Sequence, residues 1–196
     1  MEKTGFMMKR ELRARMRARN RALDPAERAA ASCEIFRRVE RLEAFAKART
    51  VGVFCSLPDE PDTREALARW GSVKRVAVPR VEGASMRFFR YDPCTQHIGA
   101  FGIEEPGPEA EECLPGELDL IVVPGVAFTS RGERMGRGRG YYDRYLTQPT
   151  LRAVKIGVCF AHQLVDTLPV EPHDVPMDCV VTEAFPETFP EAFPEP

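Results

Sequence analysis

Residues 119–145 read DLIVVPGVAFTSRGERMGRGRGYYDRY, and this stretch decides the fold. It opens with Asp119–Val123, an uninterrupted apolar run typical of a strand that is covered on both faces in a parallel sheet. A glycine-rich loop follows, and a helix is predicted to begin near Gly140. A strand, a loop and a helix in this order predict an α/β domain, in which ligands bind at the carboxyl ends of the strands.

Shorter apolar runs on both sides of this segment predict the rest of the sheet. The candidate strands are Thr50–Phe54, Arg75–Val78, Met86–Tyr91, Ala153–Val158 and Cys179–Val181. A short helix is expected at Thr63–Trp70. Strands that alternate with helices predict a doubly wound α/β sandwich, which we assign to one domain over residues 1–182. Residues 183–196 repeat Glu-Ala/Thr-Phe-Pro and are expected to form an extended acidic tail outside the core.

Two helices are predicted before the first strand. The first is basic and has an apolar stripe at helical spacing, formed by Met8, Leu12, Met16 and Leu23. The second is expected to start at Asp24 and Pro25, because aspartate caps a helix and proline fits its first turn. Its apolar face is formed by Ile35, Val39, Leu42 and Ala46.

Composition and charge exclude several classes of protein. The 196 residues carry a net charge of −2, which argues against a general nucleic-acid coat, although the basic segment 1–23 requires an anionic partner. Six scattered cysteines without a CxxC pair predict reduced thiols rather than a zinc site or a disulfide framework. There is no apolar run of the ~20 residues that a membrane helix needs, and no secretory signal, so we expect a cytoplasmic protein.

The loop before the predicted helix has the composition of an anion site. Gly136, Gly138 and Gly140 alternate with Arg137 and Arg139. Glycines let backbone N–H groups approach an anion closely, and arginine offers a planar fork for phosphate oxygens. The pattern is neither a Walker loop nor a dinucleotide GxGxxG motif. A flexible RG-rich loop is the alternative interpretation.

Basic and acidic side chains elsewhere could complete a nucleotide site. Lys9 and Arg13 are four residues apart, so they share one helix face and would neutralise phosphate charge if that helix folded over the loop. Asp143 and Asp178 could bind magnesium, which takes one or two carboxylates beside phosphate oxygens and water. A solvated basic helix and ordinary capping or surface acids are the alternatives.

Several ordered motifs together resemble the 5-formyltetrahydrofolate cyclo-ligase family. The main one is VPGVAF, followed by GxRMGRGRGYYDRYL, at residues 123–146. The likeness extends from about Lys9 to Glu183 and includes KRELR at 9–13, SLPDEPDT at 56–63 and FGIEEP at 101–106. One departure is Thr129, where the family usually has aspartate; another is Met135, which replaces the common leucine.

The resemblance implies a role for each matching residue. ATP would be bound by Lys9, Arg10, Glu11, Leu12, Arg13, Arg134, Met135, Gly136, Arg137, Gly138, Arg139, Gly140, Tyr141 and Tyr142. The folate would contact Cys55, Glu60, Phe101, Arg137, Gly138, Arg139, Gly140 and Tyr141, and magnesium would bind Asp143 and Asp178. Arg137 and Arg139 would be catalytic, because they would stabilise charge on the phosphoryl group in transfer. Glu60 as a surface acid and Phe101 as a core aromatic are the alternatives.

The resemblance also implies a fold and a reaction. The fold would be a three-layer α/β/α sandwich with a mostly parallel sheet, shared with some sugar-phosphate isomerases and CoA transferases. The reaction would convert 5-formyltetrahydrofolate into 5,10-methenyltetrahydrofolate with ATP and magnesium, in a monomer that binds small molecules and neither nucleic acid nor membrane. The rival hypotheses are an isomerase or CoA transferase on the same fold and an RNA-binding protein.

Overall fold

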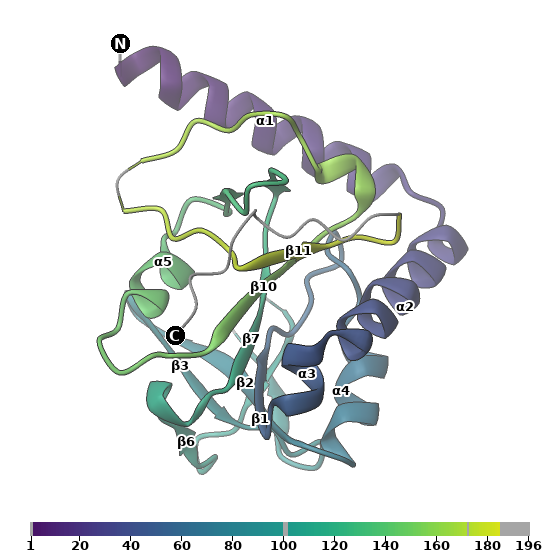
Figure 1. The fold of residues 1–196 in the computed structure, drawn as a ribbon, viewed down its shortest axis with the longest axis vertical. Coiled ribbons are helices and arrows are strands. Elements are labelled where there is room, and N and C mark those ends of the chain that lie inside the picture. Colours follow the sequence, from purple (N-terminus) through teal and green to yellow (C-terminus); the bar gives the residue numbers. More distant parts are fainter. Residues whose placement is uncertain (1, 100–101, 172, 185–196) are drawn as a thin grey trace.

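The computed structural model describes residues 2–99, 102–171 and 173–184, and its centre is a seven-stranded sheet (Figure 1). The order of its strands is β11-β10-β7-β1-β2-β3-β6. Neighbours from β11 to β2 pair in parallel, whereas β3 pairs antiparallel with β2 and with β6. The strands are β1 Thr50–Val53, β2 Arg75–Glu82, β3 Ser85–Arg90, β6 Glu112–Cys113, β7 Leu120–Pro124, β10 Val154–Val158 and β11 Cys179–Val181. The predicted α/β fold with a mostly parallel sheet is confirmed.

Two short hairpins lie outside the main sheet. They are β4 Gln96–Ile98 with β5 Glu104–Pro106, and β8 Ala127–Phe128 with β9 Arg134–Met135. The second hairpin interrupts the segment that the sequence predicts as one loop between strand and helix. The helices are α1 Glu2–Ala22, α2 Pro25–Arg41, α3 Glu43–Lys47, α4 Arg64–Gly71 and α5 Tyr141–Leu146.

Alternating residues of β7 show that both faces of the sheet are covered. Leu120 and Val122 join the apolar cluster built by α2, α3 and α4, which includes Trp70. Ile121 and Val123 join the cluster on the other face, to which α5 contributes. All four are fully buried, as expected for a central strand with period-two alternation between two apolar layers. The result is the three-layer arrangement.

The second predicted helix begins where expected but ends early. Asp24 caps α2, and its Oδ1 accepts a hydrogen bond from the backbone N–H of Ala26 at 2.8 Å. Leu42 is extended (φ −69°, ψ 138°) and separates α2 from α3, so the prediction that one apolar face continues to Ala46 is wrong. Ala46 is exposed, and Phe45 packs instead against Trp70 with 4.8 Å between ring centroids.

Helix α1 crosses the loops that follow the carboxyl ends of the strands, at the top of Figure 1. On this helix, the side chain of Met16 is 2% exposed and packs in a small cluster with Val126, Ala127 and Met135. Met8 is 56% exposed, so the predicted apolar stripe is wrong at its first position. Within the described part of the chain, no helix combines the length and apolarity needed to cross a membrane.

The sheet order creates a switch point between β1 and β7. The chain proceeds from β1 to β2 on one side, and from β7 to β10 and β11 on the other. Loops that leave neighbouring parallel strands in opposite directions open a crevice at their carboxyl ends. Here the crevice lies between Phe54, which follows β1, and Gly125, which follows β7.

Candidate active site

A cleft occupies the switch point, and its lining residues come from the loops after β1, β7 and β9, from strands β2, β3, β5, β7 and β9, and from the start of α5. They are Phe54, Cys55, Leu57, Glu60, Pro79, Val81, Met86, Glu105, Pro124, Gly125, Arg134, Gly136, Arg137, Arg139, Gly140, Tyr141, Tyr142 and Asp143. Cys55 and Glu60, which the resemblance assigns to folate, therefore lie in the same cleft as the glycine-arginine loop, residues 136–140. Burial, with Glu104 and Glu105 nearby, raises the pKa of the Cys55 thiol to about 12, so it is neutral.

Helix α1 and the glycine-arginine loop are in direct contact. Arg13 Nε donates a hydrogen bond to the Gly136 carbonyl oxygen at 2.9 Å. Gly138 has a φ of +95°, and a Cβ at that position would lie 3.4 Å from Arg13 Cζ. Glycine therefore suits the left-handed backbone and the close approach of the guanidinium. The two segments that the sequence assigns to phosphate binding form one surface.

The glycine-arginine loop keeps hydrogen-bond donors unused. Among the contacts of the described residues, no amide N–H of residues 136–140 donates a hydrogen bond. The Arg139 side chain is exposed at the cleft, and within the same residues its guanidinium has no hydrogen-bond or ion-pair partner. Free amides and a free guanidinium in one loop form the donor set that an anion requires.

Arg137, in contrast, is held by two buried carboxylates. Its Nη2 donates to Asp59 Oδ1 at 2.6 Å and its Nε donates to Glu60 Oε1 at 2.8 Å. Burial raises the pKa of Glu60, and the opposing effect of Arg137 is smaller. For Asp59 burial also acts upward, but Arg137 and Arg17 outweigh it and hold the pKa below its ordinary value. Arg137 is thus oriented by the loop that follows β1.

Asp143 lines the cleft and is paired with a buried arginine. Its Oδ1 accepts from Arg134 Nη2 at 2.6 Å, and the Arg134 side chain is 3% exposed. Arg134 Nε and the Tyr142 hydroxyl are buried without a hydrogen-bond partner in the described part of the chain. Buried polar atoms are normally paired, and both of these residues line the cleft, so the two atoms are candidate donors to a ligand there.

Asp178 does not reach the cleft. It directly precedes β11, at the amino end of the strand, and accepts from the Lys155 backbone N–H at 2.7 Å and from Lys155 Nζ at 2.9 Å. Asp174 lies beside helix α1, because its Oδ2 is 3.6 Å from Lys9 Nζ. Lys9 also pairs with Glu171 at 3.2 Å, and among the described residues its ammonium makes no hydrogen bond or ion pair with the glycine-arginine loop. The structure therefore does not bring together the two aspartates chosen from the sequence.

The other predicted residues take different places. Arg10 and Glu11 are exposed, whereas Leu12 and Met135 pack in the apolar cluster beneath α1. Tyr141 lines the cleft, and its hydroxyl donates to the Gly83 carbonyl oxygen at 3.2 Å. Phe101 lies outside the described residues.

Thr129, the departure from the family pattern, closes the turn between β8 and β9. It is fully buried, and its hydroxyl lies 2.9 Å from Glu133 Oε2. The backbone N–H of Glu133 in turn donates to Thr129 Oγ1 at 3.3 Å. Threonine thus shapes this turn together with a carboxylate supplied four residues later.

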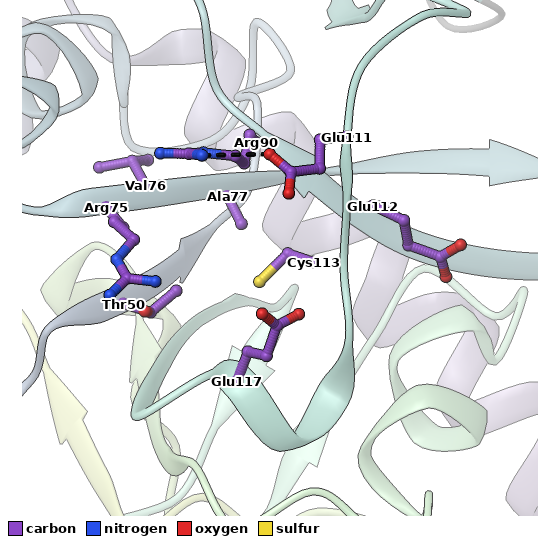
Figure 2. Close-up of a pocket in the computed structure, with 9 residues that line it drawn as sticks. All are labelled: Thr50, Arg75, Val76, Ala77, Arg90, Glu111, Glu112, Cys113 and Glu117. Atoms are coloured by element: carbon purple, nitrogen blue, oxygen red, sulfur yellow. Dashed lines mark hydrogen bonds and ion pairs between the residues drawn. The ribbon is translucent and has the colours of Figure 1, made fainter.

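Figure 2 shows a second pocket at the opposite end of the sheet, where Thr50 and Arg75 begin β1 and β2. Cys113 and Glu117 lie at its centre (Figure 2). Burial, with Glu117 nearby, raises the pKa of the Cys113 thiol to about 11, so this thiol is protonated. No glycine is among the described residues that line this pocket, and the loop predicted to bind phosphate lies at the carboxyl-end cleft.

Comparison with known proteins identifies the family. Residues 6–183 match the 5-formyltetrahydrofolate cyclo-ligase family. The chain belongs to this family. It is 33% identical over 180 residues to the 5-formyltetrahydrofolate cyclo-ligase of Escherichia coli K12, a match that covers 85% of this chain and 96% of the relative. The mouse cyclo-ligase is 30% identical over 193 residues, covering 91% of this chain and 95% of that protein.

A solved cyclo-ligase-like structure has the same fold. The NMR structure of Aquifex aeolicus 5,10-methenyltetrahydrofolate synthetase superimposes with a TM-score of 0.85 at 33% identity. The superposition covers 96% of this chain and 95% of that chain. The family resemblance read from the sequence is confirmed.

Sequence reasoning missed part of this cyclo-ligase site. The β2–β3 hairpin supplies an apolar wall through Pro79, Val81 and Met86. The sequence places Asp59 only in the SLPDEPDT turn, although its carboxylate accepts from Arg137. The strand predicted at Arg75–Val78 stops short of Pro79 and Val81, whereas β2 continues to Glu82 and pairs with β3. Nothing in the local pattern shows that this hairpin faces the glycine-arginine loop.

Proposed function

We propose that this protein converts 5-formyltetrahydrofolate into 5,10-methenyltetrahydrofolate, with ATP as co-substrate and ADP and phosphate as the other products. One observation carries the proposal: Arg13 of α1 contacts Gly136 at 2.9 Å, beside a cleft that contains both the glycine-arginine loop and Glu60. The family membership of the chain supports the folate as the substrate. The phosphates and the folate would meet where these segments converge.

The donor set fits a triphosphate. The amides of residues 136–140 and the Arg139 guanidinium have no partners within the described structure, and the Arg13 Nη groups make no hydrogen bond there either. Arg134 Nε and the Tyr142 hydroxyl offer two further buried donors. We assign the terminal phosphate to this set, because charge-assisted hydrogen bonds from arginine and backbone amides to phosphate oxygens are strong.

Magnesium, where bound, would neutralise triphosphate charge and orient the terminal phosphate. Asp143 fits this role, since it is the one aspartate that lines the cleft within the described residues and one carboxylate suffices beside phosphate oxygens. We place Asp174, adjacent to Lys9, as the second candidate. Asp178 does not fit, because its carboxylate is bound by Lys155 at the amino end of β11, whereas the cleft lies at the carboxyl ends of the strands.

The proposed reaction overcomes a poor electrophile. Nitrogen donation stabilises a formyl amide, and hydroxide is a poor leaving group. Transfer of the terminal phosphoryl group to the formyl oxygen creates an iminium phosphate and releases ADP. The anilino nitrogen of the folate then attacks the formyl carbon and loses its proton, the ring closes, and phosphate departs with the oxygen.

The protein contributes position and charge to these steps. Arg139 and Arg137 would stabilise negative charge on the transferred phosphoryl group, and Arg13 would hold the other phosphates. Glu60 would accept hydrogen bonds from the amino edge of the pterin. Its Oε2 accepts from the Leu57 backbone N–H at 3.0 Å, which fixes the carboxylate in the cleft.

A turnover assay tests the proposal. The purified protein is mixed with 5-formyltetrahydrofolate, ATP and magnesium, and the strongly absorbing methenyl product is followed. We expect ATP-dependent product, and Arg139→Ala to lower kcat by about 10²- to 10³-fold, the usual loss for one oxyanion-type donor. Its melting temperature should stay unchanged, because the Arg139 side chain is exposed and its guanidinium makes no hydrogen bond or ion pair with the described residues.

Arg131→Ala is the matched control. Arg131 is an arginine of the neighbouring turn, its side chain is 63% exposed, and it does not line the cleft. We expect wild-type turnover from this variant. A wild-type protein without ATP-dependent product would refute the proposed function and favour an isomerase on the same fold.

A further inference from the structure

We propose that Asp59 is a positioning residue that couples the seating of helix α1 to the orientation of Arg137. The catalytic part of this inference rests on the proposed function. Asp59 is 5% exposed and lies in the turn between β1 and α4. It does not line the cleft, so it acts through Arg137 rather than on a substrate.

The Asp59 side chain joins two elements. Oδ1 accepts from Arg137 Nη2 at 2.6 Å, and Oδ2 lies 3.4 Å from both Arg137 Nη1 and Arg17 Nε. Arg137 belongs to the glycine-arginine loop and Arg17 to α1. Glu60 holds the Nε edge of the same guanidinium at 2.8 Å. Two carboxylates on two edges define one orientation of the planar group, which a single carboxylate does not.

The Asp59 main chain adds a second link to α1. Its carbonyl oxygen accepts from Asn20 Nδ2 at 2.9 Å, and Asn20 is 3% exposed. Since the Asn20 amide nitrogen donates to Asp59, its Oδ1 faces His162 Nε2, which lies 2.5 Å away and donates. This contact ties α1 to the short turn Ala161–Gln163 after β10.

Three polar residues of α1 lie on one helix face toward the site. Arg13, Arg17 and Asn20 are spaced at i, i+4 and i+7, so they point the same way. Arg13 holds the loop at Gly136, and the other two hold Asp59. The helix, the turn after β1 and the glycine-arginine loop therefore form a closed circuit of contacts, with Asp59 at the junction.

A double-mutant cycle tests the catalytic half. Asp59→Asn keeps the size and the main-chain carbonyl but removes the charge that orients Arg137. We expect kcat to fall by about 10- to 100-fold, as for a small misplacement of a catalytic group, while KM for 5-formyltetrahydrofolate stays within about threefold. In an Arg137→Gln background the same change should alter kcat by less than about threefold, because residues that act as a unit are not additive.

Asp62→Asn is the matched control. Asp62 belongs to the same turn, but its carboxylate pairs with exposed Arg64. We expect wild-type kcat from this variant. Wild-type kcat in Asp59→Asn, or independent multiplicative losses in the double variant, would overturn the inference.

Hydrogen exchange tests the structural half without any turnover. In both Asp59→Asn and Arg137→Gln, the amides of residues 13–20 should exchange faster than in the wild type, and no faster in the double variant. Unchanged exchange of α1 in both single variants would overturn the coupling. If the wild type forms no methenyl product, the proposed function fails, while this exchange cycle still decides whether Asp59 links α1 to Arg137.

Discussion

Replacing Asp143 by asparagine should destabilise the protein measurably, because Asp143 neutralises Arg134, which is almost fully buried. Removal of one partner from a buried ion pair costs about 3–5 kcal/mol. The Asp143 side chain is 17% exposed and asparagine retains an oxygen that accepts from Arg134, so we expect a smaller loss of about 2 kcal/mol, below that range. Against a typical total of about 5–15 kcal/mol the variant stays folded.

Urea denaturation measures this loss. With a slope of about 2 kcal/mol per molar urea, the midpoint should fall by about 1 M. Asp178→Asn is the control, because its carboxylate is 31% exposed and pairs with partly exposed Lys155; its loss should stay below about 1 kcal/mol. In the turnover assay, Asp143→Asn should also need more magnesium and Asp178→Asn should not. An Asp143→Asn midpoint equal to that of the wild type would refute the stabilising ion pair between Asp143 and Arg134. A larger rise in magnesium requirement for Asp178→Asn than for Asp143→Asn would make Asp178 the magnesium ligand instead.

Two further predictions concern the turn between β8 and β9 and the contact below α1. Thr129→Asp should lower the free energy of unfolding by about 2 kcal/mol or more, because it buries a second carboxylate against Glu133. It should not raise turnover. A variant more active than the wild type would show instead that threonine weakens the site. Burial, and to a lesser extent a nearby arginine, lowers the pKa of His162. As the pH falls through the ordinary value of about 6.5, the unfolded chain takes up a proton that the folded protein resists, so the free energy of unfolding decreases. Urea titrations between about pH 7.5 and 5.5 should show this decrease in the wild type and less of it in His162→Gln; parallel profiles would contradict it.

The fold was largely predictable because its strands are short apolar runs. Asp119–Val123 predicted a doubly covered strand, and the structure places β7 in the middle of the sheet. The β8–β9 hairpin was not predictable in the same way, since strands of two residues have no period to detect. The early end of α2 was also not predictable: Phe45, beyond that end, packs against Trp70, a contact between segments that the local pattern does not relate.

The site was predictable where its residues are neighbours in the sequence, and unpredictable where it depends on contacts between residues far apart in the sequence. Alternating glycines and arginines predict an anion-binding loop, and the structure places this loop in the cleft. The partner of Arg137 lies 78 residues away, so no spacing rule indicates Asp59. Asp178 has the right chemistry for a metal, but only the register of β10 and β11 shows that it sits at the amino end of the strand.

The central claim is that α1 and the glycine-arginine loop enclose the phosphates of one nucleotide. Calorimetric titration of magnesium-ATP into the wild type, Arg13→Ala and Arg21→Ala tests it most directly. Arg21 is exposed at the far end of the same helix and serves as the control. We expect Arg13→Ala to weaken ATP binding by about tenfold or more, equivalent to about 1.4 kcal/mol, and Arg21→Ala to bind ATP as the wild type does. Wild-type affinity in Arg13→Ala would contradict it.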